Sequence, residues 1–357
     1  MAEEHHNSPG QSSTPKRSRT WIQKIDPAVL LAAPQGVTLR SIIPHGSSQW
    51  AETARIDAVD DQDEGEIQYF LKVAEGELGA KMIKGEYASM CALYPHVQHG
   101  KAPRPFAWGR YDRDEPEVFF LLSEFVSMVD GGLPGVGEVA ALVARLHREG
   151  ASPDGRFGFG VGTCHGSTVV EHGWHDTWEG YFTETTRVLL GMEQEAQGGD
   201  SEIMELAGRW FDRVVPRLLR PMETEGREVR PVMLHGDLWH GNVGIDRIMG
   251  EVVVFDAAGF YGHNEYELGV WRQEWNDFSQ SGYVEGYLEH IPPSWPEEDF
   301  DDRNLLYATR VNILDSILYK EDRSYRQAFI RDMRTLVEKF PGGFEEWKAR
   351  HDEGKKE

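Results

Sequence analysis

The sequence has little cysteine, little basic charge and no long apolar run. Its two cysteines, Cys91 and Cys164, are too few for a disulfide framework, and neither lies in a C-x-x-C pattern typical of zinc or redox sites. No apolar run approaches the roughly 18 residues that a membrane-spanning helix needs. The N-terminus is polar where a signal peptide would be apolar. We therefore expect buried thiols, no membrane partner and a cytoplasmic location.

The shortage of basic residues argues against a nucleic-acid partner. Lys and Arg total 37 against 60 Asp and Glu, which gives a formal net charge of −23, whereas binding to a phosphate backbone needs a basic surface. One short basic cluster, 16–19, lies in a Ser- and Pro-rich stretch at the N-terminus. We interpret it as part of a disordered tail, with an import or phosphorylation-regulated patch as the alternative.

The chain is otherwise typical of a globular protein. Its 357 residues are 39% hydrophobic and include 11 Trp, enough for one large or two ordinary domains with a substantial core. In the first third, alternating apolar residues between turn-forming clusters predict an antiparallel sheet. A helical stretch that Pro95 ends, a loop at Pro103 and Pro105, and a further strand follow. The predicted strands are 37–43, 50–59, 67–73 and 118–122, and the predicted helix is 79–93.

The remaining two thirds are predicted to be mostly helical around a small β-hairpin. Apolar stripes at helical spacing predict helices over 135–148, 178–190, 203–219, 265–278, 303–319 and 325–340. The fold class is therefore α+β with two lobes, an N-terminal antiparallel β-sheet lobe with one main helix and a larger helical C-terminal lobe.

The most informative motif combines 233–243 with the strand-like run 252–256. It contains Asp237, Asn242 five positions later, and Asp256 at the end of an apolar, β-branched segment. In protein kinases this spacing provides an Asp that accepts the proton of the acceptor hydroxyl, and an Asn and a second Asp that hold magnesium. Taken alone, HGD could equally be a turn and FD the end of a strand, but their order and spacing here favour a kinase-type site that uses ATP and Mg²⁺.

A lysine and a glutamate upstream fit the same interpretation. Lys72 alternates out of an apolar strand, and Glu86 lies in the helix that follows, as do the lysine that contacts the nucleotide phosphates and its glutamate partner in kinases. The alternative for Lys72 alone is a solvent-facing lysine on an edge strand. The downstream motif favours the phosphate-binding role.

Two further segments are candidates for nucleotide contacts. The loop 44–50 lies between the first two predicted strands but contains one glycine only, so backbone N–H groups and the hydroxyls of Ser47 and Ser48 would have to bind phosphate. Residues 123–126 follow the last strand of the sheet, where a hinge between lobes would lie. Their backbone groups could contact adenine, and an ordinary linker is compatible with the same position.

With these motifs in place, the chain resembles the fructosamine-3-kinase (ketosamine-3-kinase) family, within the superfamily of protein-kinase-like and aminoglycoside phosphotransferases. The resemblance covers about 25–340. It rests on L-H-G-D-L-W-x-G-N at 234–242, on F-D-A-A-G-F-Y-G-H-N-E-Y-E-L at 255–268, and on supporting matches at 157–159, 163–164 and 174–182. The domains expected are a disordered tail (1–20), an N-lobe that clamps the nucleotide (21–122), a hinge (123–127), a C-lobe with the catalytic and acceptor site (128–350) and a charged tail (351–357).

The resemblance implies ATP-dependent phosphorylation of the sugar 3-hydroxyl in a ketosamine, the Amadori adduct of a sugar with an amine. The resulting 3-phosphate is unstable, so the amine is regenerated. The implied substrates are glycated proteins or small ketosamines, and the implied assembly is a monomer or a weak dimer. The alternatives are a kinase of the aminoglycoside or choline type with a different hydroxyl acceptor, and a non-catalytic nucleotide-binding module.

The same resemblance assigns roles by position. Asp237 is the expected base, Asn242 and Asp256 are the metal ligands, and Lys72 with Glu86 clamps phosphate. Glu124 and Val126 would contact adenine through their backbones, and Trp239 offers an apolar face to a sugar, the alternative being a core tryptophan that supports the loop.

Further roles are expected around the acceptor. His240 and His263 are candidate substrate residues. His263, Glu265 and Glu267 could position the substrate or the metal-binding Asp256, and the alternative for the acidic pair is capping of a helix N-terminus. Two departures from the family pattern stand out. The chain has Asp-Ala-Ala at 256–258 in place of Asp-Pro-Ala, and His240 where a small residue is usual.

Overall fold

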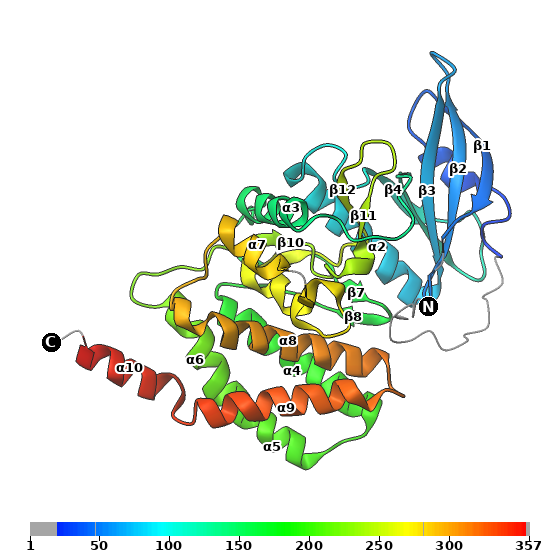
Figure 1. Cartoon of the computed structure of the whole chain (residues 1–357). Coiled ribbons are helices and arrows are strands. Elements are labelled where there is room, and N and C mark those ends of the chain that lie inside the picture. Colours follow the sequence, from blue (N-terminus) through cyan, green and yellow to red (C-terminus); the bar gives the residue numbers. More distant parts are fainter. Residues whose placement is uncertain (1–19, 47, 281, 355–357) are drawn as a thin grey trace, which may run out of the picture.

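The computed structural model describes residues 20–46, 48–280 and 282–354. Its first part is an antiparallel sheet of five strands in the order β1-β2-β3-β5-β4 (Figure 1). The predicted basic cluster 16–19, most of the predicted tail 1–20, Ser47 and the last three residues lie outside the described residues. The strands are β1 (Val37–Pro44), β2 (Glu52–Asp60), β3 (Glu66–Glu75), β4 (Pro105–Arg110) and β5 (Val118–Glu124).

Alternating side chains give this sheet two apolar faces. In β2, Ala54, Ile56 and Ala58 are buried in one cluster while their neighbours are more accessible, the alternation expected of a pleated strand. The short helix α1 (Pro27–Ala32) adds its buried Val29 to that cluster. On the other face, the helix α2 (Gly76–Leu93) buries Met82 and Ile83 against a second cluster. The sheet is thus fixed to α2, the helix that carries Glu86.

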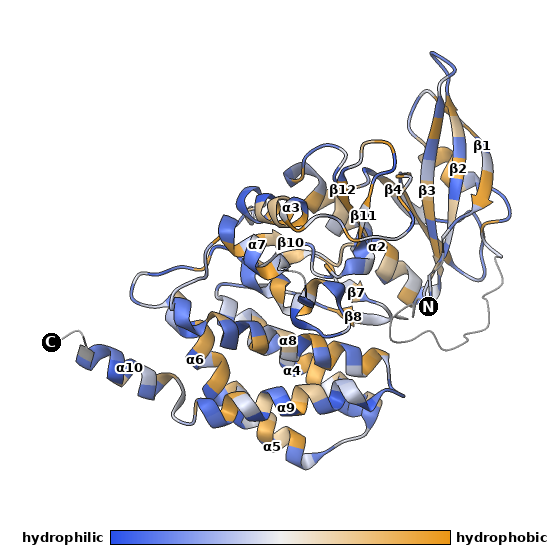
Figure 2. Cartoon of the chain, viewed as in Figure 1, coloured by the Kyte–Doolittle hydropathy of each residue, from blue (hydrophilic) through white to orange (hydrophobic). Residues whose placement is uncertain are grey.

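The second part is mostly helical and surrounds short strands (Figure 1). Two large apolar clusters hold it together, and Figure 2 shows hydrophobic and hydrophilic residues alternating around its helices. The helices are α3 (Val136–Glu149), α4 (Trp178–Gln197), α5 (Ser201–Arg209), α6 (Val215–Leu219), α7 (Tyr283–His290), α8 (Phe300–Leu318), α9 (Arg323–Lys339) and α10 (Gly343–Gly354).

The short strands of this part carry the central loops. The strands β10 (Val232–Leu234) and β13 (Phe260–Gly262) pair in a four-stranded sheet with β6 (Phe157–Gly158) and β9 (Trp174–His175). Two hairpins stand beside it, β11 (Val243–Ile245) with β12 (Val252–Val254), and β7 (Thr163–His165) with β8 (Thr168–Val170). The predicted α+β fold with two lobes is therefore confirmed.

Three local expectations were wrong. Pro105 does not lie in a loop but begins β4, an edge strand in which the missing N–H of its first residue is tolerated. The predicted helix 265–278 is instead two 3₁₀ segments, η5 (Asn264–Arg272) and η6 (Asp277–Gln280). The two cysteines are not buried as expected, because Cys91 is exposed and Cys164 is partly exposed. Within the described ranges, no helix is both long and apolar enough to span a membrane.

Candidate active site

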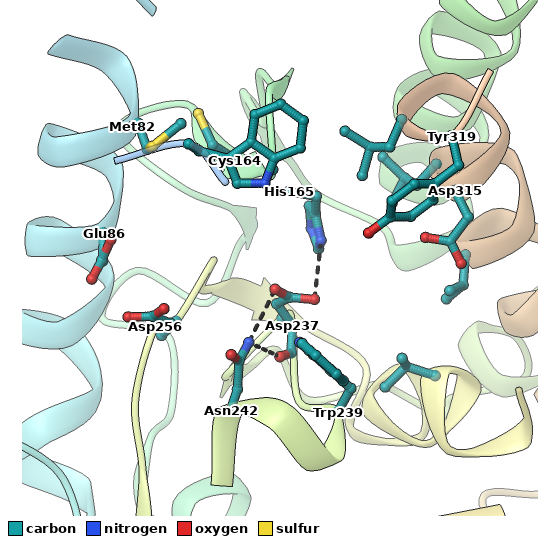
Figure 3. Close-up of a pocket in the computed structure, with 18 of the residues that line it drawn as sticks. Met82, Glu86, Cys164, His165, Asp237, Trp239, Asn242, Asp256, Asp315 and Tyr319 are labelled. Atoms are coloured by element: carbon teal, nitrogen blue, oxygen red, sulfur yellow. Dashed lines mark hydrogen bonds and ion pairs between the residues drawn. The ribbon is translucent and has the colours of Figure 1, made fainter. Parts of the chain in front are cut away.

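A cavity of about 250 Å³ lies between the two lobes (Figure 3). The N-lobe contributes Lys72 from β3 and Glu86 from α2, while the loops after β10 and β12 contribute the residues of the central motif. Residues far apart in the sequence therefore meet here. The predicted site residues that line the cavity are Ser48, Lys72, Glu86, Asp237, Trp239, Asn242 and Asp256.

Asp237 and Asn242 are fixed to one another in the loop between β10 and β11. The Asn242 amide Nδ2 donates to the Asp237 backbone oxygen at 2.7 Å and to its carboxylate Oδ2 at 3.1 Å. Because the Asn242 amide nitrogen faces Asp237, the side-chain carbonyl oxygen of Asn242 points away from Asp237 (Figure 3). One carboxylate oxygen thus faces an amide donor, and the amide oxygen is presented to the cleft.

A buried glutamate holds the loop that carries Asp237 through two backbone hydrogen bonds. The Glu267 carboxylate accepts hydrogen bonds from the backbone N–H groups of His235 at 2.6 Å and Gly236 at 3.0 Å. The His235 ring contacts the Phe255 backbone oxygen at 2.9 Å, which ties the loop to the residue before Asp256. Glu267 therefore holds the catalytic loop in place, a positioning role for one of the acidic residues singled out in the sequence.

Lys72 lies between two carboxylates. Its Nζ is 2.7 Å from Glu86 Oε2 and 3.3 Å from Asp256 Oδ1, and its side chain is 9% exposed. Burial would favour the neutral amine, but the Asp256 and Glu86 carboxylates outweigh it and raise the pKa of Lys72. A permanently charged ammonium is therefore held at the cavity wall.

Asp256 adopts an uncommon backbone conformation. Its φ of +57° lies in the left-handed region, which side chains other than glycine rarely adopt and which often marks functional sites. Asp256 lies two residues after the end of strand β12, and its carboxylate is 43% exposed and 3.3 Å from the Lys72 ammonium. The carboxylate is therefore accessible to a ligand.

The oxygens of Asn242 and Asp256 fit a magnesium ion. Magnesium prefers oxygen ligands and usually takes only one or two from the protein, with water and substrate phosphates completing its shell. Within the described part of the chain, no group of three or more His, Cys, Asp or Glu could form an all-protein metal cage. An amide oxygen and an accessible carboxylate match the open type of site.

His165 and Asp315 are among the cavity residues that the sequence did not single out. His165, at the end of β7, places Nδ1 3.5 Å from Asp237 Oδ1, and Asp315 projects from α8 on the opposite wall (Figure 3). Burial would raise the pKa of Asp237, but hydrogen bonds and charge from His165, with contributions from His235 and Asn242, lower it below its usual value. Asp237 is therefore ionised at neutral pH. The supporting match at 163–164 adjoins His165 and is the one signal that could have pointed to it.

Two predicted substrate residues are not brought to this cavity. The Nδ1 of His240 accepts a hydrogen bond from the backbone N–H of Asp277 at 3.1 Å, which turns the ring toward η6. His263 is 1% exposed and contacts Tyr307 and Ser294 hydroxyls, each at 2.8 Å, at the wall of a different cavity. Burial lowers the pKa of His263 to about 4, so it is a neutral, internally bonded core residue.

The remaining predicted residues lie in the N-lobe and in its connection to the C-lobe. Ser48 accepts backbone hydrogen bonds from Trp50 and Ala51, both at 3.2 Å, and so shapes the turn before β2. Glu124 ends β5, with its backbone N–H bonded to the Arg104 oxygen at 2.8 Å. Val126 follows two residues later in the connection to the C-lobe, and neither residue lines the cavity described above.

The two lobes and the cleft between them, with Lys72 held by Glu86 and Asp256 and with Asp237 at the cavity wall, define a phosphotransferase of the protein-kinase-like class. The chain belongs to the fructosamine kinase family, because the model of that family, described as "Fructosamine kinase", matches residues 43–331.

Individual relatives agree with this assignment. A chloroplastic protein-ribulosamine 3-kinase from Oryza sativa subsp. japonica is 29% identical over 245 residues, which are 67% of this chain and 65% of that protein. The ketosamine-3-kinase of Mus musculus is 35% identical over 153 residues, 43% of this chain and 45% of its own. The crystal structure of a candidate fructosamine-3-kinase from Thermobifida fusca shares the fold, with a TM-score of 0.67 at 18% identity over 85% of this chain and 95% of that one. The chain thus spans a little under two thirds of the length of the rice relative that it matches.

Proposed function

We propose that this protein is an ATP-dependent ketosamine 3-kinase. The observation that carries the proposal is the convergence of Asp237, Asn242, Asp256 and Lys72 on one cleft in a member of the fructosamine kinase family. A ribulosamine and a ketosamine kinase among its relatives support the substrate class. The product, a 3-phosphate, would release the amine and so reverse glycation of a protein or a small amine.

Asp237 would act as the base. Its ionised carboxylate accepts the proton of the sugar 3-hydroxyl as that oxygen attacks the γ-phosphorus of ATP. The new O–P bond forms while the bond from the γ-phosphorus to the β,γ-bridging oxygen breaks, and ADP leaves with that electron pair. The hydrogen bond from Asn242 and the His165 contact keep the carboxylate directed at the cleft.

Lys72 would bind the nucleotide phosphates. Its ammonium is the only Lys or Arg charge among the described residues that line the cavity, and Glu86 fixes its direction. Asn242 and Asp256 would hold Mg²⁺, which neutralises phosphate charge when bound. An accessible Asp256 3.3 Å from the ammonium places that ligand beside the phosphate site.

The nucleotide and the acceptor would occupy opposite ends of the cleft. Ser48 and the backbone after β5, at Glu124 and Val126, lie on the N-lobe side and would contact phosphate and adenine. Trp239 lies on the C-lobe side, two residues from Asp237, with its ring in edge contact with Trp275 at 5.9 Å. Its face would support the sugar ring beside the base.

A substrate panel tests this function. Turnover with ATP and Mg²⁺ is measured for fructosamines, ribulosamines, an aminoglycoside and choline, with specificity read as the ratio of kcat/KM values. We expect ketosamines to exceed the other acceptors by at least about 100-fold, because a site that binds particular polar groups rejects compounds that lack them. Preference for an aminoglycoside or choline, or no turnover of any ketosamine, would contradict the proposal.

A further inference from the structure

Asp315 is a cavity residue that the phosphoryl-transfer chemistry does not use. It lies near the C-terminal end of α8, on the wall that faces Asp237 and His165, beside Tyr319 (Figure 3). The nucleotide-binding residues come from the N-lobe and from the loops after β10 and β12. Asp315 therefore belongs to the acceptor side of the cavity.

Its carboxyl group is poorly satisfied by the protein. The Oδ2 atom is shielded from solvent and has no hydrogen-bond partner among the described residues. Burial and the nearby Asp237 carboxylate raise the pKa of Asp315 to about 8. The neighbouring Trp275 indole N–H opposes this shift, but its geometry does not make a hydrogen bond, so that Nε1 is left without a partner in the described part of the chain as well. A buried polar group without a partner costs stability, so its presence in a cavity indicates that a ligand supplies the missing partner.

The surroundings of Asp315 select the charge of that ligand. Among the described lining residues the single Lys or Arg is Lys72, which Glu86 and Asp256 already engage. Aromatic rings line the acceptor side of the cavity together with Asp315. Aromatic rings beside a carboxylate are the typical environment of a bound ammonium group. These rings are Trp239, Trp275, Tyr319 and Tyr325. The acceptor side thus favours a cation.

We infer that Asp315 is the counter-ion for the protonated secondary amine of the ketosamine. The inference rests on the proposed function, and it names the residue that distinguishes a ketosamine from an uncharged sugar. In a ketosamine the amine is attached to C1, two carbons from the hydroxyl that receives phosphate. One carboxylate, Asp237, contacts the reacting hydroxyl, and the facing carboxylate, Asp315, contacts the amine of the same molecule.

The test compares two acceptors that differ at one position, where one has a positive charge and N–H donors and the other has neither. One is a small ketosamine with a protonated amine, and the other carries an ether oxygen in place of the amine nitrogen. Wild-type protein, Asp315→Asn and Asp301→Asn are assayed with both. Asp301 lies on the same helix, and its side chain is 77% exposed in an ion pair with Arg272, so this variant is a matched control.

We expect Asp315→Asn to raise KM for the amine by about 10- to 100-fold, since a charge-assisted hydrogen bond is lost. Its kcat should change little, because the side chain at position 315 does not touch the reacting hydroxyl. Turnover of the ether should stay at the wild-type level, which also shows that the variant is folded. Asp301→Asn should match the wild type with both acceptors.

Two results would overturn the inference while leaving the proposed function intact. An equal loss of kcat/KM with both acceptors in Asp315→Asn would show that Asp315 only shapes the cavity. Unchanged kcat and KM with both acceptors would show that Asp315 contacts neither of them. If the wild-type protein phosphorylates neither compound, the proposed function fails, and the counter-ion role is then tested by binding alone, with the affinity for each compound measured by tryptophan fluorescence. Tighter binding of the amine than of the ether by the wild type, lost in Asp315→Asn, would support the counter-ion role, whereas equal binding of the two compounds by the wild type would refute it.

Discussion

Two aspartates in one cavity differ because their surroundings differ. Asp237 has a lowered pKa because His165 and Asn242 stabilise its charge against the effect of burial. Asp315 has a raised pKa because burial and the Asp237 charge are opposed only weakly. The surroundings thus give two chemically identical carboxyl groups different pKa values, as in enzymes where one carboxyl group acts as an acid and the other as a base or nucleophile. This separation supports a base in one position and a ligand-dependent counter-ion in the other.

The raised pKa of Asp315 predicts a pH-dependent penalty on stability. Between its usual value of 3.8 and about 8, the folded protein holds a proton that the unfolded chain has lost, so stability falls as pH rises through this range. We expect Asp315→Asn to raise the melting temperature by about 2 °C more at pH 9 than at pH 5. Calorimetry at both pH values measures this, with Asp301→Asn as control. The same change in melting temperature at both pH values would contradict it.

The residues predicted from the sequence are those whose geometry is local or follows a fixed motif. Asp237 and Asn242 share one loop, and Asp256 ends the next hairpin, so their spacing alone brings them together. His165 and Asp315 reach the cavity only through packing of β7 and α8 against that loop, which no short pattern encodes. His263 belongs to the same motif as Asp256, yet it turns into the core because Tyr307 and Ser294 bind both of its nitrogens.

At the scale of the element, the catalytic loop depends on a turn that only glycine allows. Gly236 has a φ of +81°, and a Cβ added there would lie 2.2 Å from the Ala258 backbone oxygen. The close approach brings the loop of Asp237 against the loop of Asp256. A side chain at this position would push the two loops apart.

Gly236→Ala should therefore lower the free energy of unfolding by about 3 kcal/mol, since both the backbone conformation and the contact become unfavourable. Its kcat should also fall because Asp237 shifts. Gly191→Ala is the control. Gly191 lies in α4, and a Cβ added there would meet no other atom within 4 Å. Because alanine favours a helix more than glycine does, this variant should raise the free energy of unfolding by about 0.5–1 kcal/mol. Denaturant unfolding measures both. Equal stability of Gly236→Ala and wild type would disprove the turn argument.

Elements with a clear period were predicted well, and those that depend on tertiary contacts were not. The alternation of β2 and the stripe of α3 follow directly from residue spacing. In η5, however, the Gly269 Cα packs so closely on Tyr307 that an added Cβ would lie 2.7 Å from the Tyr307 Cβ. The Glu265 carboxylate is drawn to Arg303 at 2.8 Å. These contacts with α8 replace the regular helix that the pattern favoured.

At the scale of the whole molecule, the proposed function assigns the nucleotide mainly to one lobe and the acceptor to the other. The N-lobe sheet presents Lys72, a cation for an anionic nucleotide, within a chain of net charge −23. The C-lobe presents aspartates and aromatic rings, which suit a cationic acceptor. The sequence alone already led us to expect the nucleotide in the N-lobe and the acceptor in the C-lobe, but the wall formed by α8 became visible only in the folded chain.

The most direct test of the account is the loss of the base. Wild-type protein and Asp237→Asn are incubated with ATP, Mg²⁺ and a ketosamine, and phosphate transfer is followed by ³¹P NMR. We expect wild type to form one phosphomonoester at the sugar 3-oxygen, and Asp237→Asn to lower kcat by about 10²- to 10⁴-fold with nucleotide binding retained. Turnover by Asp237→Asn at the wild-type rate, or phosphate on another hydroxyl, would contradict it.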